Sequence, residues 1–116
     1  MTIKLNQRAY DYAKWLVKEG RYVLDNRDDW SEHQPSSEAE NRFIHENGIS
    51  EYGRWHLGLD DAHSANAKEY YKFPYGDFKK VHRCAVLAAE SRAGQYKYST
   101  IELAAAHLHG MLEAVV

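Results

Sequence analysis

The chain has 116 residues, of which 44% are hydrophobic and 28% charged, which suffices for one domain with its own core. Its net charge of −2 argues against general affinity for nucleic acid, and a single cysteine, Cys84, excludes an intrachain disulfide. No apolar run approaches the roughly 18 residues of a membrane span, and charges interrupt the N-terminus where a signal peptide would be apolar. We therefore expect a cytoplasmic protein without a membrane partner.

An amphipathic helix is predicted near the N-terminus. Asn6 is a suitable N-cap for it, and Gly20 a suitable stop. Between them apolar residues recur at the three-four spacing of a helix with one buried face. This inner face consists of Ala9, Tyr12, Ala13, Leu16 and Val17. Residues 22–24 fit either an extension of this helix or a short extended piece.

The next segment is polar and predicts a loop over residues 25–36. A short helix should follow over residues 37–47, because Ser37 and Glu40 have the spacing of a capping box.

Residues 49–60 carry conflicting signals. Ser50 is able to cap a helix here, although Gly53 and Gly58 weaken that interpretation. Residues 54–59 also alternate well enough for a strand. We favour a short helix or turn and leave the strand open.

The last third of the chain predicts a helix hairpin. Asp77 is a suitable N-cap for its first helix, which we expect to end at Gly94. Ser99 and Glu102 form a capping box for the second helix, and the short connection favours antiparallel packing. The buried stripe of the second helix should be Ile101, Ala104, Leu108, Met111 and Val115.

These elements predict an all-α fold, or a mainly α fold with one minor extended piece. We expect a single helical domain over residues 1–116, with four to five short helices. The C-terminal hairpin should pack against the first helix.

Two stretches carry a resemblance to known proteins. The sequences KFPYGDFKKVHRCAVLAAESRAG and AAAHLHGML resemble a group of small bacterial proteins to which no activity is assigned. This resemblance extends along most of the chain, including WSEHQP and YGRWHLGLD, and implies no catalytic residues. Separately, Phe73-Pro74-x-Gly76-Asp77, followed by His82 and Ala85, is similar to an F-P-x-x-D-x-x-x-A segment of phage-associated proteins. That likeness implies a small helical module.

Seven histidines raise the question of a metal site. On a helix His107 and His109 point to different faces, because positions two apart do not face each other. The sequence has neither H-x-x-x-H nor C-x-x-C spacing, so we predict no metal and no cofactor. The alternative is a site that joins His82, Glu90 and His107 across the hairpin.

Catalysis and anion binding are also weakly supported. Cys84 lies on a row expected to be buried, so we interpret it as a core residue rather than a nucleophile. The absence of any recognised catalytic motif leaves enzymatic activity uncertain and makes a non-enzyme the favoured interpretation. Lys79, Lys80 and Arg83 form an alternative anion or nucleic-acid contact near the predicted helix start.

The acidic middle of the chain is the predicted contact region. Residues 25–61 hold three basic and ten acidic side chains, a balance of −7. Within them Trp30 stands in a polar loop beside Asp28 and Asp29, as an aromatic anchor for a basic protein partner or for self-association. The predicted function is therefore a small non-catalytic interaction protein. The alternatives are a metal- or small-ligand-binding protein, with or without enzymatic activity, and a nucleic-acid accessory protein.

Overall fold

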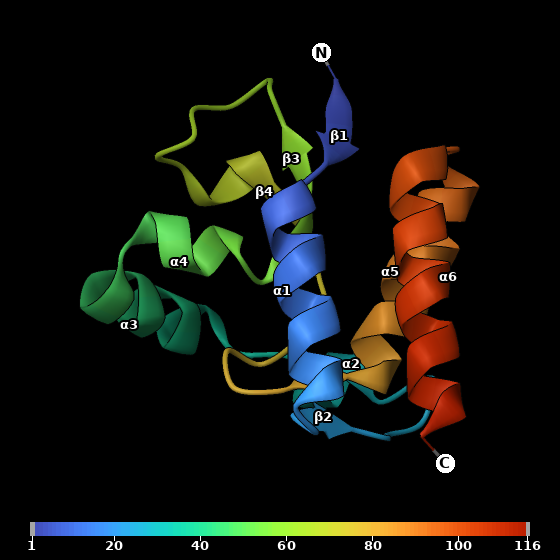
Figure 1. Ribbon diagram of the computed structural model, residues 1–116. Coiled ribbons are helices and arrows are strands. Elements are labelled where there is room, and N and C mark those ends of the chain that lie inside the picture. Colours follow the sequence, from blue (N-terminus) through green and yellow to red (C-terminus); the bar gives the residue numbers. More distant parts are fainter. Residues whose placement is uncertain (1, 116) are drawn as a thin grey trace.

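The computed structural model describes residues 2–115 and has a mixed α/β fold, so the prediction of an all-α fold is wrong (Figure 1). Its elements, in chain order, are β1 (Ile3–Leu5), α1 (Gln7–Lys18), β2 (Tyr22–Val23), α2 (Trp30–His33), α3 (Ser37–Asn47), α4 (Ile49–Gly53), β3 (His56–Asp60), the 3-10 turn η1 (Lys68–Tyr70), β4 (Tyr71–Pro74), β5 (Val81–His82), α5 (Arg83–Gln95) and α6 (Ser99–Ala114).

The strands form two small sheets. β3 is the central strand of an antiparallel sheet with the order β1-β3-β4. β2 and β5 form a separate parallel pair, in which Tyr22 lies opposite Val81 and Val23 opposite His82. β1, β2 and β5 have only two or three residues each, which is too short for an alternating pattern to stand out in the sequence, whereas β3, with five residues, carries the alternation noted above. The strands are therefore stabilised by pairing with distant segments rather than by local preference.

The core lies between the sheets and three helices. α5 and α6 form the predicted hairpin, and α1 stands beside α6 and contacts β3 (Figure 1). Ala9, Ala13, Leu16, Leu57, Val86, Ile101, Leu108 and Leu112 are among the buried residues of this core. No helix within residues 2–115 is both long enough and apolar enough to cross a membrane.

Both ends of α1 and the C-terminal end of α3 agree with the predictions. Asn6 caps α1, and Gly20 follows its end in a left-handed conformation, with φ of 78°. α3 spans the predicted residues, and Gly48, with φ of 90°, closes it. The cap of α3 is Ser36 rather than Ser37, because the Ser36 hydroxyl accepts the hydrogen bond from the first turn.

Residues 49–60, for which the sequence left helix and strand open, contain a helix followed by a strand. Residues 49–53 form α4, which agrees with the favoured helix or turn, whereas residues 56–60 form β3, which agrees with the strand alternative. Residues 22–23 adopt the extended alternative and form β2. Residues 25–36, predicted as a loop, also contain the short helix α2.

The first hairpin helix begins at Arg83, six residues later than predicted from Asp77. The Asp77 carboxylate instead caps a turn, where it accepts hydrogen bonds from the backbone N–H groups of Lys79 at 3.0 Å and Lys80 at 2.8 Å. His82, which has extended backbone angles, therefore lies in a strand and Cys84 at the start of α5, whereas the prediction placed both residues in the middle of one helix.

The remaining hairpin predictions are partly wrong. α5 runs through Gly94 to Gln95, and the left-handed residue of the connection is Lys97, with φ of 61°. Tyr98 rather than Ser99 occupies the cap position of α6, without a side-chain hydrogen bond. Leu108 is fully buried as predicted, but Val115 is 44% exposed because it lies beyond the packed part of the helix.

Candidate functional site

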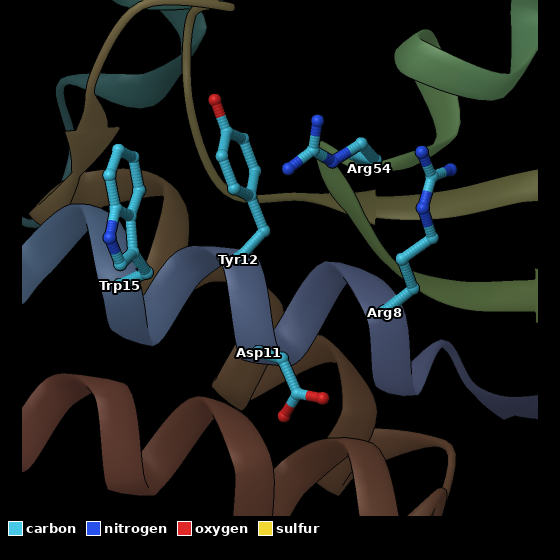
Figure 2. A pocket seen from close by; sticks show the side chains of 5 residues that line it. All are labelled: Arg8, Asp11, Tyr12, Trp15 and Arg54. Carbon is cyan, nitrogen blue, oxygen red and sulfur yellow. The ribbon is translucent and has the colours of Figure 1, made fainter.

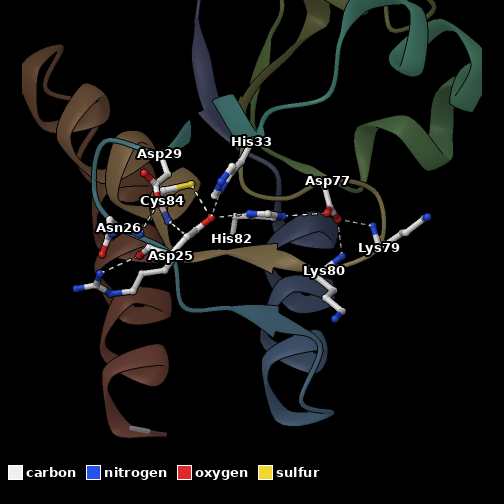
Figure 3. A network of polar contacts seen from close by, with 10 residues as sticks. Asp25, Asn26, Asp29, His33, Asp77, Lys79, Lys80, His82 and Cys84 are labelled. Atoms are coloured by element: carbon white, nitrogen blue, oxygen red, sulfur yellow. Dashed lines mark hydrogen bonds and ion pairs between the residues drawn. The ribbon is translucent and has the colours of Figure 1, made fainter. Parts of the chain in front are cut away.

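A buried carboxylate, Asp25, is the centre of a polar cluster (Figure 3). Its Oδ2 atom lies 2.8 Å from Nδ1 of His33 and 2.7 Å from Nδ1 of His82. The Cys84 thiol donates to the same oxygen at a distance of 3.0 Å. The other oxygen, Oδ1, accepts the backbone N–H of Cys84 at 2.8 Å. Three side chains thus converge on one carboxylate oxygen.

The parallel pair β2–β5 explains how these residues meet. Val23 lies opposite His82, so continuing this register by two residues brings Asp25 beside Cys84. His82 is the last extended residue before α5, and Cys84 lies in the first turn of that helix. Both side chains contact Oδ2 of Asp25, and the backbone N–H of Cys84 donates to its Oδ1. His33 is the last residue of α2, and its ring points toward Asp25 (Figure 3).

His82 is held by a carboxylate on each ring nitrogen. Its Nδ1 faces Asp25, and its Nε2 lies 2.9 Å from Oδ2 of Asp77. The hydrogen bond with Asp77 is the main reason why the pKa of His82 is raised, with Asp25 adding to it against the effect of burial. The two carboxylates thus favour the charged, imidazolium form of His82 in the metal-free protein.

The two carboxylates are correspondingly acidic. Burial acts to raise the pKa of Asp25, but hydrogen bonds from Cys84, His33 and His82 outweigh it and hold this pKa far below its usual range. Burial also acts against Asp77, yet the hydrogen bonds from His82 and two backbone N–H groups lower its pKa to about 2. Both side chains are therefore anionic near neutral pH.

Cys84 is not an activated nucleophile in this arrangement. Burial raises the pKa of its thiol well above the usual range, and the hydrogen bond to anionic Asp25 raises it further. The residue is fully buried, as the sequence predicts. A reactive cysteine needs exposure and a stabilised thiolate, and Cys84 has neither.

The cluster has the composition of a transition-metal site. Asp25, His33, His82 and Cys84 each offer one ligand atom, and these atoms all lie within 4.8 Å of one another. Within residues 2–115 this is the one group of at least three histidine, cysteine or acidic side chains that converge in this way. Three of the four residues are buried, whereas His33 is exposed at the edge.

The metal site predicted as an alternative is not assembled. His82 belongs to the Asp25 cluster, but Glu90 accepts a hydrogen bond from Nδ1 of His109 at 3.0 Å. His107 is exposed, and its ring contacts that of Tyr10 edge-on. A helix that begins at Asp77 would carry His82 and turn it toward the second helix, but α5 begins only at Arg83.

The basic residues singled out in the sequence do not form an open anion site. Lys79 and Lys80 are exposed in the turn before β5. The Arg83 guanidinium is already engaged: its Nε donates to Glu113 at 2.7 Å and a terminal nitrogen donates to the backbone carbonyl of Asp25 at 3.1 Å. Arg83 therefore helps to fix the Asp25 loop.

The predicted partner contact lies next to the cluster. Trp30 is half-buried, and its ring centroid lies 5.8 Å from that of His82. Asp29 accepts a hydrogen bond from the backbone N–H of Asn26 at 2.9 Å, whereas Asp28 is exposed. Trp30 thus packs partly on its own chain and keeps part of its surface accessible.

Sequence reasoning missed Asp25 and His33. Both lie in a polar segment interpreted as a loop, where an aspartate and a histidine are unremarkable. The available signal was the pair His82 and Cys84, whose side chains contact one carboxylate because α5 begins between them, at Arg83. Assigning these two residues to a helix placed them on different faces and removed that signal.

Away from the Asp25 cluster, a pocket of about 640 Å³ lies on the exposed side of α1 (Figure 2). It is lined by Arg8, Asp11, Tyr12, Trp15 and Arg54. The Arg54 guanidinium lies 3.8 Å from the Tyr12 ring centroid, Tyr12 stacks on Trp15, and Arg21 covers Trp15. Glu51 forms ion pairs with both Arg8 and Arg54. The charged groups of this surface are thus largely paired within the protein, although Nε of Arg54 has no hydrogen-bond partner among residues 2–115 and Trp15 is 46% exposed. We assign no ligand to this surface.

Comparison of the chain with protein-family models, with curated proteins and with solved structures found no match. The resemblances drawn from the sequence remain expectations, and a functional proposal rests on the geometry of the Asp25 cluster.

Proposed function

We propose that the protein is a small zinc-binding protein whose ligands are Asp25, His33, His82 and Cys84. The observation that carries this proposal is the convergence of their four ligand atoms within 4.8 Å of one another. The proposal replaces the sequence-based expectation of no metal, because that expectation considered only the ligand spacing along the chain.

The donor set favours zinc over other common cations. Thiolate, imidazole and carboxylate are the three ligand types of protein zinc sites, and four protein ligands match its tetrahedral preference. Calcium and magnesium favour oxygen ligands, of which this cluster offers one residue in four. Because four side chains would fill the coordination sphere, a structural site is a better fit than a catalytic one.

Metal binding requires a small rearrangement. Ligand atoms around tetrahedral zinc lie roughly 3.3–3.7 Å apart, given zinc–ligand distances of about 2.0–2.3 Å. Three contacts to Oδ2 of Asp25 are 2.7–3.0 Å in this structure, so the carboxylate would withdraw by less than about 1 Å. The Cys84 proton and the proton on Nδ1 of His82 would be released to solvent, and the proton on Nδ1 of His33 would move through solvent to Nε2 of the same ring.

Asp77 supports the same proposal from outside the ligand set. The hydrogen bond that it accepts from Nε2–H of His82 directs Nδ1 toward Asp25. Histidine ligands in metal sites usually donate their other ring N–H to a carboxylate in this way. The cluster therefore has both a ligand set and an orienting partner.

Zinc titration of the full chain, purified without a histidine tag and stripped with a chelator, tests the proposal. Calorimetry should give one zinc per chain, and cobalt should give the visible absorption of a tetrahedral site with a thiolate charge-transfer band. His33→Ala is the most informative variant, because His33 is exposed and its loss should spare the fold. His107→Ala is the matched control, since His107 is an exposed histidine outside the cluster.

Two results would contradict the proposal. One is the absence of stoichiometric zinc binding by the folded protein, which would leave the cluster as an internal ion network. The other is equal zinc affinity of the His33→Ala and His107→Ala variants.

A further inference from the structure

An open groove of about 1150 Å³ runs along α2, β4 and α5, and Trp30 separates it from His82 of the Asp25 cluster. Trp30, Ser31 and Gln34 line it from α2 and its C-terminal end, and Ala85, Ala88 and Arg92 line it from α5. All four residues of β4 also line it. Because successive side chains of a strand point to opposite faces, the groove follows the edge of β4.

The charges of the groove are not balanced. Its acidic residues include Glu40 and Asp60, which are already engaged: Glu40 pairs with Lys68 at 3.0 Å, and Asp60 accepts the backbone N–H of Ala62 at 3.0 Å. The charged lining residues for which residues 2–115 provide no ion pair or side-chain hydrogen bond are Arg27, Lys72, Arg92 and Asp28. Lys68 compensates the charge of Glu40, so three cations stand against the exposed Asp28 and the buried Asp60, a balance of +1 for a ligand to neutralise.

Aromatic side chains accompany these cations. Trp30 is half-buried at the α2 wall, and Tyr96 is 55% exposed at the end of α5. Phe73 of β4 also lines the groove, with its ring against that of Tyr98. Exposed aromatic surface next to arginine is typical of contacts that anchor a protein ligand.

The edge of β4 is not suited to adding a further strand. Pro74 lacks an N–H, Lys72 places a charge on the edge, and Phe73 has φ of 61°, which breaks the extended backbone. A ligand would therefore be recognised through side chains. The groove also exceeds the roughly 300–1,000 Å³ of most small-molecule pockets, which favours a longer and more extended occupant.

We propose that this groove binds an extended acidic segment of a partner protein. Arg27, Lys72 and Arg92 face the carboxylates of the segment, and Trp30 contacts an apolar side chain between them. The sequence alone suggested a basic partner at Trp30, because the surrounding residues are mostly acidic along the chain. The fold changes this expectation by bringing Lys72 and Arg92 to the same groove from distant segments.

Fluorescence anisotropy with a fluorescein-labelled peptide that alternates glutamate and leucine tests this inference. The matched probe has lysine in place of glutamate. We expect the acidic peptide to bind and the basic one not to bind, with affinity that falls as salt is added. Arg92→Glu and Arg27→Glu should each weaken binding by about fivefold or more, whereas Arg42→Glu, an exposed arginine of α3 outside the groove, should not. Circular dichroism of each variant excludes loss of fold.

Several outcomes would overturn the inference. They are equal binding of both peptides, unchanged affinity of the Arg92→Glu and Arg27→Glu variants, and tighter binding of a single-stranded oligonucleotide than of the acidic peptide. A dimer that Arg92→Glu dissociates in sedimentation experiments would instead assign the groove to a second copy of the chain. None of these readouts requires zinc, so this inference and the proposed function can fail independently.

Discussion

Asp25 accepts both the backbone N–H and the thiol of Cys84, although 59 positions separate the two residues. These bonds connect the loop after β2 to the first turn of α5. The same carboxylate neutralises His82, so a single side chain satisfies polar groups from β5, α5 and α2, the last through His33. Removing it leaves several buried donors without an acceptor.

Asp25→Asn should therefore destabilise the metal-free protein strongly. The amide keeps the shape of the carboxylate but loses its charge, and its NH2 group opposes donors that now face the carboxylate. Breaking a buried pair typically costs about 3–5 kcal/mol, and we expect a loss of that order in urea unfolding at pH 7. Asp28→Asn, at an exposed position, should change stability by no more than about 0.5 kcal/mol. Similar losses in the two variants would show that the cluster contributes little to folding.

A buried histidine outside the cluster predicts a loss of stability in mild acid. His56 is 3% exposed, and its ring Nδ1–H donates to the backbone carbonyl of Tyr52 at 2.9 Å. Burial is the main cause that lowers the pKa of His56 from 6.5 to about 4. The unfolded chain then takes up the proton more readily, so the free energy of unfolding should fall as pH drops from 6.5 to 4. The shift corresponds to on the order of 3 kcal/mol.

The pKa shifts of His82 and Asp77 do not cause this loss of stability in mild acid. The pKa of His82 is raised, so its contribution is fully present below its unfolded pKa and disappears only as pH rises through the folded value. Asp77 has a pKa of about 2, so its contribution is lost only as pH falls toward that value. Urea melts at pH 7 and pH 5 should therefore differ less in His56→Asn than in the wild type. An unchanged pH dependence in that variant would contradict the assignment, and His107→Asn is the control.

The hairpin provides a test of core packing. Leu108 is fully buried on α6, so Leu108→Ala should cost about 2–5 kcal/mol. The neighbouring His109 is only half-buried and pairs with Glu90 and Glu113 near the surface. Its replacement by alanine should cost much less than that of Leu108. Equal shifts of the urea midpoint would mean that the face of α6 assigned to the core is incorrect.

The helices were predictable because their signals are local. Asn6 and Gly20 bracket α1 within a single segment, and the fully buried Leu108 follows from the three-four spacing of α6. The strands and the Asp25 cluster depend on pairing between distant segments, and two residues such as Tyr22–Val23 carry no period of their own. One local error had a large consequence, because starting α5 at Asp77 concealed that His82 and Cys84 both contact Asp25.

The last prediction concerns Asp77, which contacts His82 but does not belong to the proposed ligand set. Its Oδ2 lies 2.9 Å from Nε2 of His82, and the backbone N–H groups of Lys79 and Lys80 fix its other oxygen. If zinc binds Nδ1, the Nε2–H group donates to Asp77 and holds the ring in position. Asp77→Ala should then lower zinc affinity by about 10–100-fold, in the range typical of such orienting carboxylates.

Asp77→Asn separates orientation from overall stability. The asparagine side chain retains an oxygen that accepts from Nε2–H, so this variant should lose less zinc affinity than Asp77→Ala. Competition with a chromophoric chelator measures the affinities, and urea melts of the metal-free variants at the same pH measure the fold. Asp28→Ala, at an exposed acidic position, is the control for the loss of one negative charge. Wild-type zinc affinity in a folded Asp77→Ala variant would mean that Asp77 does not orient His82 for metal, and that its hydrogen bond serves the fold alone.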